Sequence, residues 1–352
     1  MKPFFFFLIV CMSFVACSMQ TQYSDNTIEL DTEIKQTAKS FNKDIVPLPK
    51  EFIYAKSFHV YEDSILIVLN KKNKETSFLE FYNLQTNDSI GQYLSYGQGP
   101  CEFLDAKIHL YDNLLAIEDI HKKEWLYLNL DSLRSELLHN PQMIKINTYT
   151  FDVIPYKQGS FITEDLNYFY SEDLGMDFRT ERLKRIMPDY TESNEDIPPF
   201  YVKNVVGGII LPNFSKERVV YASQYYPIVE IYDDDLLLHK TITGPDDIKP
   251  QYMVVDNEVI FKKRIPYSYL AHTQNKDFFY LTYMGNFYEV EKKLIDYPLW
   301  LFKYDWNGNL LNSFYVGEYV KSISVSGDGK SFYATSYDEE ENPILIKLLP
   351  NE

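Results

Sequence analysis

The segment SFLEFYNLQTNDSIGQYL, residues 77–94, combines an apolar alternating strand that ends at Asn83 with a second, shorter strand. The same form recurs in EWLYLNLDSLRSELL (124–138), PIVEIYDDDLLLHKTI (227–242), PLWLFKYDWNGNLLNSF (298–314) and PILIKLLPNE (343–352). The turn residues Asn129, Asp233 and Asp305 stand at points equivalent to Asn83, and a degenerate copy, GMDFRTERLKRIMPDY (175–190), fills the longest gap. A repeat of roughly 40 to 50 residues with four short strands per copy is typical of a β-propeller.

The repeats predict an all-β fold, a six-bladed β-propeller of four-stranded antiparallel blades. One four-stranded sheet cannot bury both of its faces, whereas blades arranged radially cover one another. The composition agrees, because 30 Tyr and 24 Phe residues favour strands over helices. A pair of β-sandwiches and a β-helix remain as alternatives.

The last copy supplies only three strands, KSISVSGD (321–328), SFYATSYD (331–338) and PILIKLL (343–349). A ring with one incomplete blade leaves open sheet edges, which folded proteins normally cover. We therefore expect an N-terminal strand within TIELDTEIK (27–35), at about residues 27–34, to pair with the last blade and close the ring.

The N-terminus predicts export. Met1 and Lys2 precede an apolar run from Phe4 to Val10 that is too short to span a membrane, as in a secretory signal. The following SFVACS (13–18) resembles the lipobox of bacterial lipoproteins, in which Cys17 becomes the lipid-bearing first residue. An ordinary signal peptide cut nearby is the alternative. We assign residues 1–16 to the signal peptide, 17–26 to a tether and 27–352 to the propeller.

The predicted location is the cell envelope, with the lipid on Cys17 holding the protein to the outer membrane. The residues that follow, SMQTQYSDN (18–26), lack an acidic cluster directly after the cysteine, which favours the periplasmic face.

The stretch YLSYGQGPCEF (93–103) lies between the expected fourth strand of blade one and the first strand of blade two. Its glycines can adopt positive φ, its proline bars strand pairing, its glutamate can accept backbone N–H bonds and its last phenylalanine can insert between blades. A shorter echo, TITGPDD (241–247), follows blade four, whereas the Lys and Ser or Thr of a phosphate-binding loop are missing. We predict a structural corner made by Gly97, Gly99, Pro100, Glu102 and Phe103.

The core of this corner, GQGPCEF (97–103), resembles the G-x-G-P-G-E-F signature of the TolB-like six-bladed β-propeller lipoproteins of Bacteroides-type bacteria. Cys101 stands where that family usually has Gly. The lipobox and the repeat count extend the similarity across nearly the whole chain. The resemblance implies no catalytic residues.

Charge and residue spacing exclude several kinds of partner. The net charge of −17 argues against nucleic acid and anionic membrane surfaces, which both select for positive patches. The six histidines are scattered without metal-ligand spacing, so we expect no metal and no cofactor.

The first strands of the blades offer Lys107, His109, His272 and Ser324 to the axis. A metal-dependent propeller hydrolase or lactonase, the alternative function, would need a carboxylate cluster there.

Aromatic residues gather in the links between second and third strands, which share one face with the links between blades. Tyr and Phe side chains there suit recognition of sugars or peptides. A chain with 16% aromatic residues also places some of them everywhere by composition alone. The candidate binding residues are Tyr225, Tyr226, Tyr283, Phe287, Tyr288, Tyr297 and Tyr337, joined in blade three by Tyr168, Phe169 and Tyr170.

The insertion MGNFYEVEKKLIDYP (284–298) is expected to fold as a flap over the channel beside Tyr225 and Tyr226. The predicted function is a lipid-anchored, non-enzymatic module that binds a peptide, protein or glycan. No catalytic residue and no oligomeric state is predicted.

Substitution of Cys17 by Ser tests the anchor. The variant Cys17→Ser should move the protein from the membrane fraction to the soluble periplasmic fraction, because it removes the thiol that carries the lipid. Fractionation followed by immunoblotting measures this, with wild type as the control. Unchanged membrane association of the variant would contradict the lipid anchor.

Overall fold

The structure is a computed structural model of the 352-residue chain. It describes residues 26–49, 52, 55–71, 78–99, 102–111, 113–119, 121–135, 142–145, 153–156, 160–164, 183–186, 207–248, 250, 252–255, 258–261, 264–289 and 291–351. The expected signal peptide and Cys17 lie outside these residues, as do Pro100, Tyr168, Phe169 and Tyr170.

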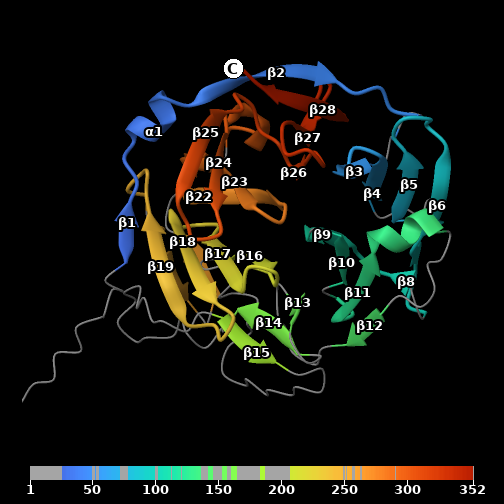
Figure 1. Cartoon of the computed structure of the whole chain (residues 1–352), viewed down its shortest axis with the longest axis horizontal. Coiled ribbons are helices and arrows are strands. Elements are labelled where there is room, and N and C mark those ends of the chain that lie inside the picture. The colour runs from blue at the N-terminus through green and yellow to red at the C-terminus, as the bar shows by residue number, and fades with distance from the viewer. Residues whose placement is uncertain are drawn as a thin grey trace, which may run out of the picture.

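The described strands form a ring of sheets around one axis, in the order of the sequence (Figure 1). Blade one contains β3 (Ala55–Tyr61), β4 (Ile65–Asn70), β5 (Leu79–Asn83) and β6 (Ser89–Tyr93). Blade two contains β9 (Lys107–Tyr111), β10 (Leu114–Asp119), β11 (Glu124–Asn129) and β12 (Gln142–Lys145), the third of which leads into the short helix η1 (Leu130–Ser135). The described part of blade three contains β13 (Ile154–Pro155), β14 (Phe161–Glu164) and β15 (Leu183–Ile186).

The second half of the ring repeats this order. Blade four contains β16 (Gly208–Asn213), β17 (Arg218–Ser223), β18 (Ile228–Asp233) and β19 (Leu238–Thr243). Blade five contains β22 (Ile265–Gln274), β23 (Phe278–Tyr288), β24 (Trp300–Asp305) and β25 (Leu310–Tyr315). Blade six contains β26 (Ser322–Val325), β27 (Phe332–Tyr337) and β28 (Pro343–Pro350), with β2 (Lys39–Ile45) at its outer edge. The predicted all-β, six-bladed propeller is confirmed.

Two small sheets lie between blades. The strands β7 (Ser95–Tyr96) and β8 (Glu102–Phe103) pair in parallel across the corner after blade one. The hairpin of β20 (Tyr252–Val255) and β21 (Glu258–Phe261) accounts for the extra sequence between blades four and five. Within the described ranges, no helix is long and apolar enough to cross a membrane.

The recurring Asn and Asp residues end the third strands by a common mechanism. The side-chain oxygens of Asn83 and Asn129 each accept a bond of 2.9 Å from the backbone N–H two residues later. Asp233 and Asp305 accept the equivalent bonds at 3.0 Å. Such side chains imitate a backbone turn, so each one reverses the chain at the same point of its blade.

The strands are apolar on both faces because each blade is packed between two others. All residues of β4 are buried, and successive side chains of a strand point to opposite faces. Ile67 and Leu69 join the core between blades one and two. Leu66 and Val68 join the core between blades one and six. Similar shared cores connect the remaining described blades around the ring.

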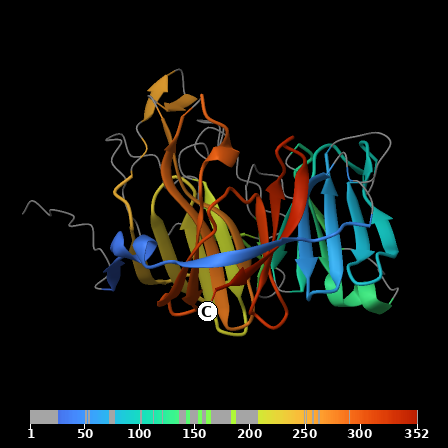
Figure 2. The same cartoon turned by 90° about the horizontal axis from the view of Figure 1, so that it is seen from above.

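The ring is closed by β2, which joins blades five and six. Five consecutive residues of β2 pair antiparallel with β28, from Phe41 opposite Pro350 to Ile45 opposite Ile346. Its first residues pair in parallel with the outer strand of blade five, Lys39 opposite Phe314. Figure 2 shows β2 crossing the rim of both blades. An N-terminal strand therefore closes the ring, as predicted.

The position of the closing strand differs from the prediction. Residues 27–34 do not pair with the last blade: β1 (Thr27–Glu29) lies parallel to β19 at the edge of blade four, and α1 (Glu33–Gln36) follows it. Lys35 binds Asp246 with its Nζ 2.8 Å from the carboxylate and lies 4.8 Å from the centroid of the Trp300 ring. This segment fastens blade four to blade five. The ring is closed by β2, which begins at Lys39, 12 residues after the expected start at Thr27.

Phe41 is the residue of β2 on which closure should depend most. It is buried and its ring centroid lies 5.2 Å from that of Phe314 and 5.8 Å from that of Phe332, one from each joined blade. We expect Phe41→Ala to lower the free energy of unfolding by about 3 to 5 kcal/mol. Ile45→Ala is the matched control on the same strand, because Ile45 is 70% exposed, and should change it by less than about 0.5 kcal/mol. Urea unfolding measures both, and equal stability of the two variants would contradict closure through Phe41.

Candidate functional site

The corner after blade one is organised by Glu102. Its Oε2 accepts a 2.7 Å bond from the backbone N–H of Gly99, and the backbone N–H of Glu102 donates back to the Gly99 carbonyl at 3.2 Å. Lys122 Nζ donates to the carbonyls of Gly99 and Glu102 at 3.1 and 2.8 Å. Phe103 is fully buried in the core shared by blades one and two. These contacts make the corner a structural element.

The glycines of the corner serve a different purpose from the one expected. Neither Gly97 nor Gly99 has a positive φ. A Cβ at Gly97 would lie 1.9 Å from Glu102 Oε2, and one at Gly99 would lie 2.9 Å from the same atom. The Glu102 carboxylate occupies the space that a side chain would fill at either position, so a substitution there would have to displace the carboxylate. In the echo at 241–247, Gly244 does have a positive φ, of 93°, and faces the Leu30 carbonyl.

Aromatic rings cross the axis from blade two to blade five. The Tyr111 ring of β9 stacks between His109 at 6.1 Å and His272 of β22 at 5.8 Å, measured between ring centroids. His109 also stacks with Trp125, 6.2 Å away, and its Nε2 lies 3.6 Å from the buried Glu118. The two histidines predicted to face the axis therefore take part in packing.

Cations gather where β3 and β26 begin, at the axis. Burial lowers the pKa of His59 to about 4, with further contributions from His109 and Lys321. Burial and the ammonium groups of Lys56 and Lys71 lower the pKa of Lys321 to about 8. Within the described residues, no group of three or more His, Cys, Asp or Glu side chains is arranged to hold a metal ion.

Partly exposed tyrosines gather at one end of blades four, five and six. We call this surface the tyrosine face, and it consists of Tyr225, Tyr267, Tyr288, Tyr319 and Tyr337. All five lie at strand ends or links on the side where β22 begins and β23 ends. The tyrosine face is thus on the predicted side of the ring.

Ring contacts join these tyrosines in two groups. Tyr267 lies 5.7 Å from Tyr225 and 6.1 Å from Tyr288 between ring centroids. Tyr319 stacks with Tyr337 at 6.4 Å. Burial raises the pKa of Tyr319 to about 12, and the phenols of Tyr337 and Tyr267 contribute to this shift. Tyr319 therefore lies near a member of each group of tyrosines. The five tyrosines therefore form one surface.

Three of the predicted binding residues are buried. Tyr283 is fully buried in the core between blades four and five and donates to Asp246 Oδ2 at 2.9 Å, so its expected place on an exposed face is wrong. Tyr226 is 6% exposed. Tyr297 is 4% exposed and accepts a 2.9 Å bond from the Glu289 backbone N–H. The buried ring of Tyr297 packs against the partly exposed ring of Tyr288, with the ring centroids 6.2 Å apart.

The insertion at 284–298 is only partly a flap. Its first residues, including the partly exposed Phe287, extend β23 as far as Tyr288, and the short helix η4 (Leu294–Asp296) follows. Glu289 lies 3.2 Å from Lys292 and 3.4 Å from Arg264. Lys293 pairs with Glu341 in the link between β27 and β28. The insertion therefore borders the tyrosine face and bridges blade five to blade six.

Sequence reasoning missed Tyr267 and Tyr319. Tyr267 is in the first strand of blade five, and Tyr319 is in the link between blades five and six. Links between blades lie on the same face of the ring as the links between second and third strands, from which the candidate residues were taken. A search that included those links and the first residues of inner strands would have found both tyrosines.

The fold and these contacts define a six-bladed propeller with a tyrosine-rich face. The family described as TolB-like 6-blade propeller-like matches residues 37–328, and the chain belongs to this family. This confirms the resemblance seen in the corner sequence. No curated protein matches the chain.

Two solved structures from Bacteroides are similar to the chain. One, described as an exported protein of Bacteroides fragilis, is 12% identical with a TM-score of 0.50, over 93% of this chain and 99% of that chain. The other, a member of the DUF4221 family from Bacteroides vulgatus, is 10% identical with a TM-score of 0.48, over 89% of this chain and 98% of that chain. At these identities the likeness concerns the fold alone.

The contact between Gly97 and Glu102 can be tested by a double-mutant cycle. Gly97→Ala should lower the free energy of unfolding by roughly 1 to 3 kcal/mol, because the new Cβ displaces the carboxylate from the Gly99 N–H. In a Glu102→Ala background the same change should cost less than about 0.5 kcal/mol.

Gly327→Ala is the control for this cycle. Its Cβ would meet nothing closer than 3.4 Å and the residue has no positive φ, so stability should hardly change. Urea unfolding of the variants gives the coupling energy. Equal costs of Gly97→Ala in both backgrounds would contradict the role of the carboxylate.

Proposed function

We propose that this protein is an exported, lipid-anchored module of the cell envelope. It binds a glycan or a peptide of another molecule through the tyrosine face. The observation that carries the proposal is the set of five partly exposed tyrosines at one end of the ring, held in two groups by ring contacts. The proposed module has no catalytic role.

The chemistry of the tyrosine face suits such ligands. A phenol offers a flat apolar ring for stacking and one hydroxyl for hydrogen bonding, with little conformational entropy to lose on binding. The rings are held by buried neighbours, Tyr297 beneath Tyr288 among them. A rigid surface of this kind loses less conformational entropy on binding than a mobile loop does.

The proposed location rests on two observations. The sequence MKPFFFFLIVCMSFVACS (1–18) has the layout of a lipoprotein signal that ends at Cys17. One of the similar solved structures is described as an exported protein. We propose that the lipid holds the propeller at the outer membrane, on its periplasmic face, with residues 17–26 as the tether.

Alanine substitution on the tyrosine face tests the binding function. The wild-type protein should capture a glycan or a peptide on arrays that carry both, and the captured compound should then be titrated by calorimetry. Tyr225→Ala and Tyr288→Ala should each weaken binding by about 2 kcal/mol, close to thirtyfold in Kd, as expected for aromatic anchors.

Tyr315→Ala is the matched control. Tyr315 is 41% exposed and packs against Trp300 with ring centroids 5.5 Å apart, but it belongs to the outer strand β25. It should leave Kd unchanged, and all three variants should keep the midpoint of thermal unfolding within a few degrees, roughly. Failure to capture any compound, or equal Kd values for Tyr288→Ala and wild type, would contradict the proposal.

A further inference from the structure

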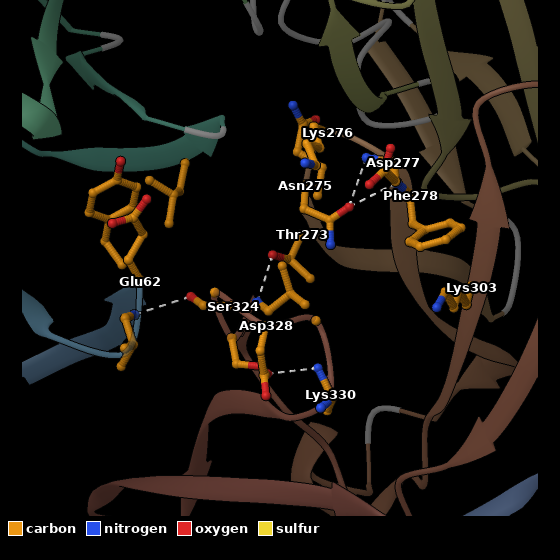
Figure 3. Close-up of a pocket in the computed structure, with 18 residues that line it drawn as sticks. Glu62, Thr273, Asn275, Lys276, Asp277, Phe278, Lys303, Ser324, Asp328 and Lys330 are labelled. Carbon is orange, nitrogen blue, oxygen red and sulfur yellow. Dashed lines mark hydrogen bonds between the residues drawn. The ribbon is translucent and has the colours of Figure 1, made fainter.

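A cavity of about 650 Å³ lies at the end of the ring opposite the tyrosine face (Figure 3). The β22–β23 hairpin forms one wall with residues 273–278, and the β26–β27 hairpin forms another with residues 324–330. The end of β3, Leu110 of β9 and Lys303 of β24 complete the lining. Its volume is in the range of small-molecule sites, and no sequence motif pointed to it.

The carboxylates nearest to the two hairpins already have partners. Asp328 Oδ1 accepts bonds from the Lys330 backbone N–H at 3.0 Å and from Ser326 Oγ at 2.7 Å, which lower the pKa of Asp328. Asp277 Oδ1 lies 3.6 Å from Lys216 Nζ. Glu62 lies on the opposite wall, at the end of β3 (Figure 3).

Three lysines of the lining have no carboxylate at ion-pair distance among the described residues, namely Lys276, Lys303 and Lys330. Lys303 is the most enclosed of the three. Its Nζ lies 3.8 Å from the centroid of the Phe278 ring and 5.7 Å from that of Tyr280, and burial lowers its pKa. Glu62, Asp277 and Asp328 match these three lysines in number, so the lining as a whole carries no surplus of positive charge.

A buried amide ties one wall of the cavity to blade four. Gln274 is 8% exposed, and its Nε2 donates to the Pro212 carbonyl at 2.9 Å. Its Oε1 accepts no hydrogen bond from the described residues. Through Nε2, Gln274 thus joins the β22–β23 hairpin to β16 of blade four.

We propose that this cavity binds a small sugar acid, the size of one hexuronic acid, with Lys303 Nζ holding the carboxylate. Phe278 offers an apolar ring edge to the C–H groups of the sugar. The site is separate from the tyrosine face and does not depend on the function proposed for that face.

Calorimetric titration of the purified full chain with D-glucuronate, D-glucose and inorganic phosphate tests this site. Glucuronate should bind at least about tenfold more tightly than glucose, because only glucuronate pairs with the lysine. Lys303→Met keeps the aliphatic stem over Phe278 and should weaken glucuronate binding about tenfold. Lys347→Met is the matched control, because Lys347 Nζ also lies over a ring, 5.1 Å from Tyr333, outside the cavity.

Equal binding of glucuronate and glucose, or an unchanged Kd for Lys303→Met, would overturn the proposal. Phosphate binding as tight as that of glucuronate would overturn the assignment to a sugar acid. If Lys303→Met does not fold, Lys330→Met on the turn should still weaken glucuronate binding, by roughly threefold, and no change would again overturn the site. Tyr225→Ala and Tyr288→Ala should leave glucuronate binding unchanged, which separates this test from that of the tyrosine face.

Discussion

Backbone pairing along β2 is the constraint on which the rest of the ring depends. A propeller has no end cap, so its first and last blades must be joined or both present open edges. Here residues 39–45 pair with β28 at the far end of the chain and with β25 of the preceding blade. Because one strand completes blade six and touches blade five, the ring can unfold only by losing contacts between distant parts of the sequence. Both ends of the ring, with the tyrosine face and the cavity, are held in place by this closure.

Most of the architecture could be predicted because it is encoded locally. Each Asn or Asp at the end of a third strand forms its own turn, so Asn83, Asn129, Asp233 and Asp305 mark blades without any long-range information. The closing strand was harder to predict from the sequence. In KSFNKDI (39–45) only Phe41 is buried, whereas TIELDTEIK alternates clearly. That alternation places Leu30 and Ile34 against the core of blades four and five, a contact that periodicity alone cannot assign to a blade.

The candidate sites were less predictable because exposure depends on neighbouring blades. Tyr283 and Tyr288 both lie on β23, but the pairing of this strand with β22 shifts register between them, so simple alternation does not predict which face each side chain takes. Tyr283 packs toward blade four and is buried, while Tyr288 packs toward blade six and reaches the surface. The role of the corner glycines was also hard to predict from the sequence. The space beside Gly97 is filled by the carboxylate of Glu102, which folds back toward it. The cavity is made by two hairpins of ordinary turn sequence, so only the structure brings its lysines together.

Native-state hydrogen exchange on two truncated chains tests ring closure most directly. One chain begins at residue 38 and keeps β2, and the other begins at residue 46 and lacks it; both lack β1 and α1. We expect amides of β25 and β28 to exchange slowly in the first chain and to lose protection in the second, since their pairing partner is gone. Equal protection of these strands in both chains would contradict closure by β2.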